Sequence, residues 1–262
     1  GDAPPPTPHR AAALERLEAQ LLLTPDDFEP SQEEMKVVGA FNPGATATGR
    51  GDEVMLLVRI AESPAEQRRG YVGLPRWEDG RIVIDWLAHD AIEVIDPRAV
   101  RVRATGTVRL TFTSHLRVVR LADGLSVDRA ALAAAPRLTP QSDYETFGLE
   151  DPRITPIDGR YAITYVAVSP HGACTALMIS EDLATFERRG VIFPPENKDV
   201  MLLPEQVDGQ YVALHRPNPS THFSPPQMWV ARSADLTHWG GHAALTLPGG
   251  LADWAVGRRS EE

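Results

Sequence analysis

The 262-residue chain lacks the features that mark several common protein classes. Its one cysteine, Cys174, cannot form an internal disulfide, and we expect it to be a small buried hydrophobic residue in a strand, not a nucleophile. No apolar run approaches the roughly 18 residues of a membrane-spanning helix. The segment 1–6 is rich in proline and has no basic region followed by an apolar run, so we expect no secretory signal and a cytoplasmic location.

Positive charge is also scarce. The chain has 26 Lys and Arg against 36 Asp and Glu, a formal net charge of −10, and this balance disfavours binding to a nucleic-acid backbone. The histidines His115, His171 and His222 show no metal-ligand spacing, and no paired Cys or His motif occurs, so no metal site is predicted. The chain also lacks a Gly-x-Ser-x-Gly elbow and a nucleotide-type phosphate loop.

The chain does contain a series of short segments rich in Val, Ile, Thr and aromatic residues, bounded by Gly, Pro or Asp-Gly. They predict an all-β domain over residues 37–262. The preceding residues 1–36 are expected to be an extension that is disordered over 1–10 and forms a short amphipathic helix over 11–23. The predicted strands include residues 54–60, 81–86, 108–113, 116–121, 161–168, 176–180 and 228–231.

Two sequence markers repeat at nearly the same interval. Asp158-Gly159-Arg160-Tyr161 returns as residues 208–211, and Ser180-Glu181-Asp182-Leu183 with Phe186 returns as residues 233–239, ending in Trp239. A repeat of about 50 residues is in the range of a four-stranded propeller blade, and about four such units follow residue 37. We expect each marker to form a tight turn and each aromatic residue to pack inward.

The segment Gly148-Leu149-Glu150-Asp151-Pro152-Arg153 carries the first candidate for chemistry. Proline pushes Asp151 into an extended conformation, as expected at a strand end, and in an extended strand Glu150 would point to the opposite face. The alternative is a structural Asp-Pro turn with a local ion pair to Arg153, since Asp96-Pro97-Arg98 repeats the same tripeptide elsewhere.

Several cations stand at strand ends, where they could meet an anion. His215 and Arg216 end an apolar strand, as Arg59 does, and Lys198 with Asp199 lies in a charged segment between strands. The alternatives are a solvated loop for residues 196–199 and a salt bridge to Glu62 for Arg59. Asn42 lies in a tight turn, where it could cap the backbone or hydrogen-bond a sugar hydroxyl.

These segments resemble glycoside hydrolase family 130, the mannoside phosphorylases and related β-mannosidases. The resemblance covers residues 37 to about 240, and its second half is the more specific. The matching segments are residues 37–45, 56–59, 148–155, 196–200 and 211–217.

The resemblance implies a five-bladed β-propeller with its active site at the axial mouth. It implies that Asp151 is the general acid, acting through a hydroxyl of the bound mannose. It also implies a phosphate site and a substrate site, with Arg69 as a further phosphate candidate. The residues carried over are Arg59, Arg153, Lys198, His215 and Arg216 for phosphate, and Asn42, Glu150, Asp199 and Glu205 for substrate.

The resemblance therefore predicts an inverting phosphorylase that converts a β-mannoside and phosphate to α-mannose 1-phosphate, with no cofactor, metal, membrane or nucleic-acid partner. The alternatives are an inverting β-mannosidase with Glu205 or Asp199 as the base, and a carbohydrate-binding propeller without catalysis. Family members continue past the equivalent of Trp254 with a blade that closes the ring. We expect the last blade here to be missing or atypical, the exposed edge to favour a homo-oligomer, and activity to be reduced.

Overall fold

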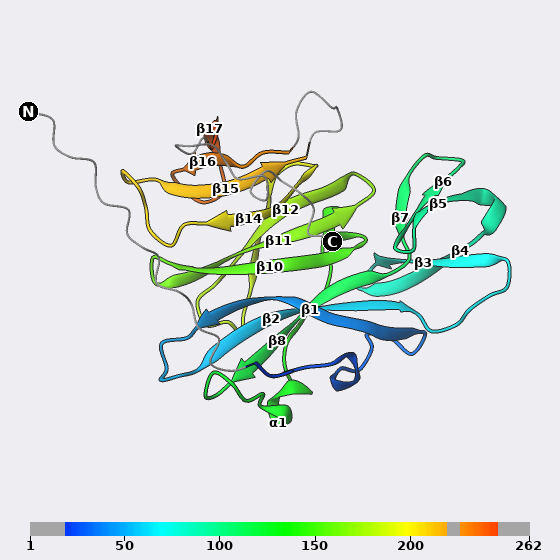
Figure 1. The fold of residues 1–262 in the computed structure, drawn as a ribbon, viewed down its shortest axis with the longest axis horizontal. Coiled ribbons are helices and arrows are strands. Elements are labelled where there is room, and N and C mark those ends of the chain that lie inside the picture. The colour runs from blue at the N-terminus through cyan, green and yellow to red at the C-terminus, as the bar shows by residue number, and fades with distance from the viewer. Residues whose placement is uncertain (1–18, 219–225, 246–262) are drawn as a thin grey trace, which may run out of the picture.

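The computed structural model describes residues 19–218 and 226–245, and within them the chain is almost wholly β-structure (Figure 1). The first strands are β1 (Met35–Ala47), β2 (Val54–Pro64), β3 (Tyr71–Glu78), β4 (Arg81–Ala88), β5 (Ile92–Asp96), β6 (Ala99–Val102), β7 (Val108–Leu110), β8 (Thr113–Leu121) and β9 (Arg137–Leu138). The later strands are β10 (Gly148–Ile157), β11 (Arg160–Ser169), β12 (Gly172–Ser180), β13 (Glu187–Phe193), β14 (Asn197–Leu202), β15 (Tyr211–Pro217), β16 (Trp229–Ser233) and β17 (Gly240–Ala244). The helical elements are one-turn segments, η1 (Pro25–Asp27), η2 (His89–Ala91), α1 (Arg129–Leu132) and η3 (Asp143–Glu145).

Two consecutive four-stranded meanders confirm the predicted repeat. The strands β10 to β13 pair in sequence order, and β14 to β17 do the same. The Asp158-Gly159 and Asp208-Gly209 markers join the first two strands of each meander, and all four residues have positive φ, between 50° and 74°. That conformation is the hairpin turn for which Asp-Gly is preferred.

The second marker also has the same structure in both meanders. The Asp182 carboxylate accepts hydrogen bonds from the backbone N–H groups of Ala184 and Thr185 at 2.8 and 2.7 Å. The Asp235 carboxylate accepts from Thr237 and His238 at 2.9 and 2.8 Å. The aromatic residues that follow, Phe186 and Trp239, pack against the hydrophobic core as expected.

The region before residue 148 departs from the simple repeat. Strands β1, β2 and β8 form an antiparallel sheet, and a single parallel pair between Ser114 and Gly148 joins β8 to β10. Gly148 has φ 131°, and a Cβ there would lie 2.6 Å from the Ser114 nitrogen, so only glycine permits this approach.

Strands β3 to β7 lie between β2 and β8 in the sequence and form two small sheets of their own, which project from the right-hand side of Figure 1. We call residues 71–110 the inserted lobe. Its core consists of Leu74, Ile92 and Val100 with Val72 and Leu87 packed against them. The sequence predicted strands in this region, but it did not predict that they would form sheets separate from the other strands.

The two largest hydrophobic clusters join strands that lie far apart in the sequence. One cluster joins β11 and β12 to β14, β15 and β16, and a second joins β2 and β8 to β10, β11 and β12. Cys174 is buried in the second cluster, and burial raises the pKa of its thiol to about 11, as suits a hydrophobic residue and not a nucleophile.

The described residues do not include the segment 1–10, expected to be disordered, or residues 11–18 of the predicted helix. They also exclude the segments 219–225 and 246–262, the latter with Trp254. Residues 19–23, the end of that predicted helix, are not helical. Leu22 and Leu23 instead pack against the core beside Phe28, because burial of these side chains overrides a helical pattern of this length. Within the described residues, no helix has the length and apolar character needed to traverse a bilayer.

Candidate functional site

Three residues with left-handed backbones lie within strands β1, β10 and β14. Asn42 in β1, Asp151 in β10 and Asp199 in β14 have φ of 47°, 46° and 62°. Each lies within a break in strand register, between Phe41 and Gly44, Glu150 and Arg153, or Lys198 and Met201. Non-glycine residues adopt this conformation at a cost and concentrate at functional sites. The positions of Asp151 and Asp199 therefore favour function over a simple turn.

The first two of these bulges are in contact. Gly44 approaches β10 so closely that a Cβ would lie 2.7 Å from the Pro152 carbonyl oxygen. This approach brings the Asn42 side-chain amide to 3.0 Å from Asp151 Oδ1, to which it donates a hydrogen bond. Asn42 thus contacts the carboxylate, where the sequence predicted a turn cap or a sugar contact.

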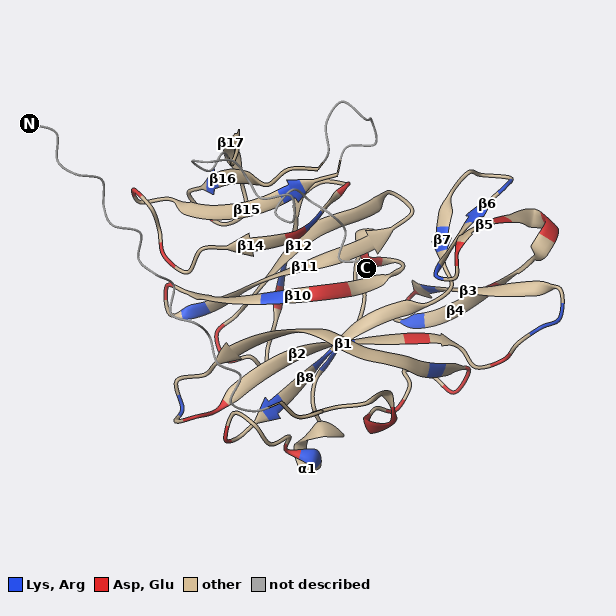
Figure 2. Ribbon diagram, in the orientation of Figure 1, with Lys and Arg blue, Asp and Glu red and all other residues tan. Residues whose placement is uncertain are grey.

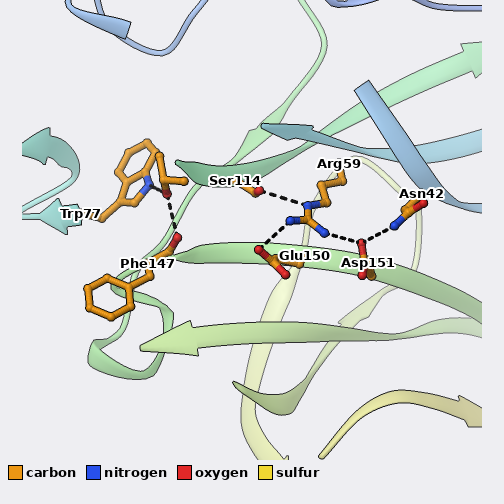
Figure 3. Close-up of polar contacts among 8 residues, drawn as sticks. Asn42, Arg59, Trp77, Ser114, Phe147, Glu150 and Asp151 are labelled. Atoms are coloured by element: carbon orange, nitrogen blue, oxygen red, sulfur yellow. Dashed lines mark hydrogen bonds and ion pairs between the residues drawn. The ribbon is translucent and has the colours of Figure 1, made fainter. Parts of the chain in front are cut away.

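The guanidinium of Arg59 joins the two carboxylates of β10 (Figure 3). It donates from Nη2 to Glu150 Oε1 at 2.7 Å, from Nη1 to Asp151 Oδ1 at 2.9 Å and from Nε to Ser114 Oγ at 3.1 Å. Because the bulge interrupts the alternation of β10, Glu150 and Asp151 both reach Arg59, and the expectation that they face opposite ways is wrong. The Glu62 carboxylate accepts from the Ser31 N–H, and the alternative considered for Arg59, an ion pair with Glu62, does not form.

Glu150 is a largely buried acid with a raised pKa. Burial raises its pKa, and the Arg59 charge opposes that rise. Lys198 and Arg98, which come from different parts of the chain, lower the pKa of the same carboxyl by smaller amounts. We call Asn42, Arg59, Glu150 and Asp151 the acid cluster.

A second group of charges lies beside the acid cluster. Arg153 follows Asp151 on β10, where Figure 2 shows acidic and basic segments side by side. Arg153 Nη2 lies 3.7 Å from Asp199 Oδ1, and Arg216 Nη2 lies 3.5 Å from Asp199 Oδ2. Lys198 pairs in register with Arg216, so adjacent strands present two cations at one point. We call Arg153, Lys198, Asp199 and Arg216 the cation cluster.

His215, predicted to hold phosphate, has both ring nitrogens in contact with neighbouring side chains. Its Nδ1 accepts from the Asn197 amide at 2.9 Å, its Nε2 lies 3.1 Å from His242 Nδ1, and its ring stacks on Phe193 at 4.6 Å. Burial, followed by the neighbouring His242, lowers the pKa of His215 to about 4. A neutral imidazole with both nitrogens engaged supports the start of β14 but adds no positive charge.

This histidine should make the protein sensitive to acid. Burial also lowers the pKa of His115 to about 3, whereas a histidine in an unfolded chain titrates near 6.5. As the pH falls below about 6.5, the unfolded chain takes up protons that the folded chain refuses. The free energy of unfolding should then fall by up to about 1.4 kcal/mol per pH unit for each histidine.

Chemical denaturation from about pH 7 to about pH 5 would measure this slope. His215→Gln should make the slope shallower, while His238→Gln, at an exposed turn, should leave it as in the parent protein. Equal slopes in all three proteins would contradict a neutral buried His215.

Two predicted residues lie away from both clusters. Glu205 is exposed in the loop after β14, and the adjacent Gln206 lies 3.4 Å from Asp158, in the turn at the other end of β10 from Asp151. Glu205 follows Asp199 by six positions, so the chain carries it away from the site and it is not placed to serve as a base there. Arg69 is exposed in the loop between β2 and β3.

The sequence reasoning did not identify three residues that hold the acid cluster in place. Ser114 binds Arg59, and the adjacent Thr113 accepts a hydrogen bond from Trp77 and donates one to the Phe147 carbonyl, each at 2.9 Å (Figure 3). Both hydroxyl side chains are fully buried. A Thr-Ser-His run opening an apolar strand was the available signal, because buried polar groups need partners.

In the described part of the chain, no group of three His, Cys, Asp or Glu side chains is placed to hold a metal ion.

Comparison with known proteins identifies the family. The family model described as beta-1,4-mannooligosaccharide phosphorylase matches residues 115–253, more than half of the chain, including Asp151 and the cation cluster. The chain belongs to glycoside hydrolase family 130. It is 37% identical over 236 residues to a beta-1,2-mannobiose phosphorylase of Listeria innocua, and 36% identical over 118 residues to a 1,2-beta-oligomannan phosphorylase of Thermoanaerobacter.

These family 130 relatives are longer proteins. The alignment with the Listeria phosphorylase covers 88% of this chain but 65% of the relative, and that with the Thermoanaerobacter enzyme covers 43% and 37%. A solved structure of the Listeria enzyme with beta-1,2-mannobiose superposes with a TM-score of 0.76 at 35% identity, over 87% of this chain and 65% of that one. The chain therefore spans about two thirds of the Listeria phosphorylase.

Proposed function

We propose that this protein is an inverting phosphorylase of β-mannosides, which uses inorganic phosphate to release α-mannose 1-phosphate and a shortened acceptor. The supporting observation is the arrangement around Asp151. One carboxylate has Oδ1 engaged by Asn42 and Arg59, and the neighbouring cation cluster holds Arg153, Lys198 and Arg216. Phosphate is already an anionic nucleophile at neutral pH, so phosphorolysis needs one acid and a cationic cradle, without a second carboxylate to activate water.

In this mechanism the glycosidic bond from C1 of mannose to the leaving oxygen breaks as a phosphate oxygen forms a bond to C1 from the opposite face. Asp151 donates its proton, through a hydroxyl of the mannose, to the leaving oxygen. Because two N–H donors occupy Oδ1, the proton belongs on Oδ2. Arg153, Lys198 and Arg216 hold the phosphate, with guanidinium groups suited to bidentate contacts.

Arg59, assigned to phosphate from the sequence, fits the acid better. Its Nη1 and Nη2 each bind a carboxylate, and the guanidinium also lies over the Phe41 ring at 4.9 Å. We therefore assign Arg59 to holding Asp151 and Glu150, and propose that Asn42 orients Asp151.

Hydrolysis by the same fold is the runner-up. An inverting hydrolase needs a carboxylate that activates water on the face opposite the acid. Glu205 is not placed for this, and the Asp199 carboxylate lies between Arg153 and Arg216, which suits a residue that orders cations. The arrangement thus favours phosphorolysis.

We further propose a β-1,2 linkage, because the Listeria and Thermoanaerobacter relatives are named for it. The proposed architecture is a five-bladed propeller, supported by the two repeated meanders and the likeness to the Listeria structure. The division at residue 36, the cytoplasmic location and the homo-oligomer stay predictions from the sequence.

The test is incubation of the protein with β-1,2-mannobiose, with and without phosphate. We expect α-mannose 1-phosphate and mannose in equal amounts when phosphate is present, and no release of mannose without it. Release of mannose without phosphate would favour the hydrolase. Binding of mannobiose with no product in either case would favour the carbohydrate-binding alternative. Parallel reactions with β-1,4-mannobiose test the linkage.

A further inference from the structure

A network of buried polar side chains lies beside the start of β10. Tyr165 Oη on β11 donates to Glu145 Oε1 at 2.5 Å, and Arg188 Nε on β13 donates to the same oxygen at 3.0 Å. The other oxygen of Glu145, Oε2, accepts from the Gln141 N–H at 2.7 Å. Arg188 also donates from Nη2 to the Thr139 carbonyl at 3.1 Å. We call Glu145, Tyr165 and Arg188 the anchor network.

The members of the anchor network pair with one another. Glu145 and Tyr165 are almost completely buried, and the Arg188 side chain is 12% exposed. Burial, followed by the charge of Glu145, raises the pKa of Tyr165, so the hydroxyl keeps its proton and acts as a donor. Arg188 supplies the charge that balances Glu145. This pairing suits the holding of a backbone and not the transfer of a proton.

Tyr165 stands directly opposite the bulge that carries Asp151. The pairing of β10 with β11 is regular up to Glu150 and resumes at Arg153, and Tyr165 is the one residue of β11 across this break. Asp151 and Pro152 therefore both lie opposite Tyr165. A bulge with two residues against one bends its strand and redirects a side chain. The position of Tyr165 thus bears on the direction in which Asp151 points.

Glu145 belongs to the segment that leads into β10. The two residues that follow it are held by backbone bonds. The Thr146 carbonyl accepts from the Trp77 N–H at 2.8 Å, and the Phe147 N–H donates to the Val168 carbonyl at 2.8 Å. Because β10 begins at the next residue, a shift of Glu145 would pass to the start of β10.

We propose that the anchor network positions the proton donor of the reaction, and that the Tyr165 hydroxyl fixes the bulge in which Asp151 lies. This inference rests on the proposed phosphorylase function. The bond from Tyr165 to Glu145 joins the strand opposite the bulge to the segment that enters it, so the bulge is held from both sides. Tyr165 acts through the backbone of β10 and is a positioning residue.

The energetics of buried charge support this role. Replacing a buried ion pair by apolar residues of similar size often leaves stability unchanged or raises it. Stability alone therefore accounts poorly for a glutamate and an arginine buried together beside the hydrophobic core. Fixing one arrangement of the backbone accounts for the pair better.

Tyr165→Phe tests the proposal because it removes the hydroxyl and leaves the ring and the pair of Glu145 with Arg188 in place. We expect kcat for phosphorolysis of β-1,2-mannobiose to fall about 10-fold, since a displacement of about 1 Å can cost about 100-fold. The KM values of mannobiose and phosphate should stay within about 2-fold, because neither ligand loses a contact. Arg188→Lys keeps the charge but not the planar fork, and should lower kcat by a smaller factor.

Tyr211→Phe is the matched control. Tyr211 is 8% exposed and also donates to a carboxylate, that of Asp158 in the turn at the other end of β10 from Asp151. Its kcat should equal that of the parent protein. An equal fall of kcat in Tyr211→Phe and Tyr165→Phe would trace the effect to a general loss of stability and overturn the proposal. An unchanged kcat in Tyr165→Phe, with or without a raised KM, would overturn it as well.

Amide hydrogen exchange separates this inference from the proposed function. In Tyr165→Phe, a peptide covering residues 146–153 should exchange faster than in the parent protein, and in Tyr211→Phe it should exchange at the parent rate. If the parent protein forms no mannose 1-phosphate, the proposed function fails, and the exchange rates still test whether the anchor network holds the bulge. Exchange at the parent rate in Tyr165→Phe would reject the anchoring.

Discussion

Asp151→Asn should lower kcat for phosphorolysis by about 1,000-fold while mannobiose binding stays within a few fold, because positioned general acids contribute about 10² to 10⁴. The amide, whose N–H is far too weakly acidic, cannot protonate the leaving oxygen. It can still accept hydrogen bonds at Oδ1 from Asn42 and Arg59, so the arrangement of the site is kept. Release of mannose 1-phosphate gives the rate, and calorimetric titration gives the affinity.

Asp208→Asn is the matched control for this variant. Asp208 has φ 52°, close to the 46° of Asp151, but lies in the exposed turn between β14 and β15. This control places the same exchange on the same backbone conformation away from the site, and its kcat should equal that of the parent protein. An Asp151→Asn protein with more than about a tenth of the parent rate would show that another group supplies the proton.

The second large effect is on stability. Arg59→Met should reduce the free energy of unfolding by about 3 to 5 kcal/mol, because it removes the partner of a buried charge. The Arg59 and Glu150 side chains are 8% and 15% exposed, and burial already disfavours the charged form of Glu150. Urea denaturation at neutral pH measures the loss.

The double variant Arg59→Met with Glu150→Gln tests the cause of that loss. Removing the charge of Glu150 should recover about 1 to 3 kcal/mol, since two residues in one ion pair are not additive. Arg189→Met breaks an exposed pair with Glu187 of similar length, 2.8 Å, and should change stability by less than about 1 kcal/mol. If the Arg59→Met protein were as stable as the Arg189→Met protein, the positive charge of Arg59 would not be needed to stabilise the buried Glu150 carboxylate.

The sequence predicted the β-class, the repeat and its turns because these depend on local rules. Asp-Gly pairs favour tight hairpins, and Ser-x-Asp-Leu places a carboxylate where two following N–H groups can bind it. Both signals act within a few residues. The two meanders therefore appear where the spacing of Asp158 and Asp208 indicated.

The arrangement of the acid cluster depends on contacts between distant strands, which the sequence does not encode locally. Alternation placed Glu150 and Asp151 on opposite faces, and the register break in β10 reversed this result. His215 appeared cationic at a strand end, but its environment comes from Phe193 and His242 on other strands. The resemblance to family 130 pointed to Asp151, whereas the ion pair between Arg59 and the Asp151 carboxylate is seen only in the structure.

The two Asp-Pro-Arg tripeptides also show that a short sequence motif does not determine its structural environment. Asp151 lies in a bulge of β10 with a left-handed backbone, and Asp96 orders a turn at the tip of the lobe. From the sequence, Asp96-Pro97-Arg98 served only as a reason to distrust the motif. In the structure its arginine pairs with Asp96 of the same turn, with 3.5 Å between Nη2 and Oδ2.

Asn42, Asp151 and Asp199 share one backbone conformation, and this limits which replacements can be interpreted. Most L-residues fit a positive φ poorly, so alanine at any of the three would change the local main chain together with the side chain. Asparagine and aspartate tolerate it about equally, and exchanging one for the other alters a proton or a charge and almost nothing else. At these three positions, exchanges between Asp and Asn are therefore the substitutions that test a chemical role without disturbing the backbone.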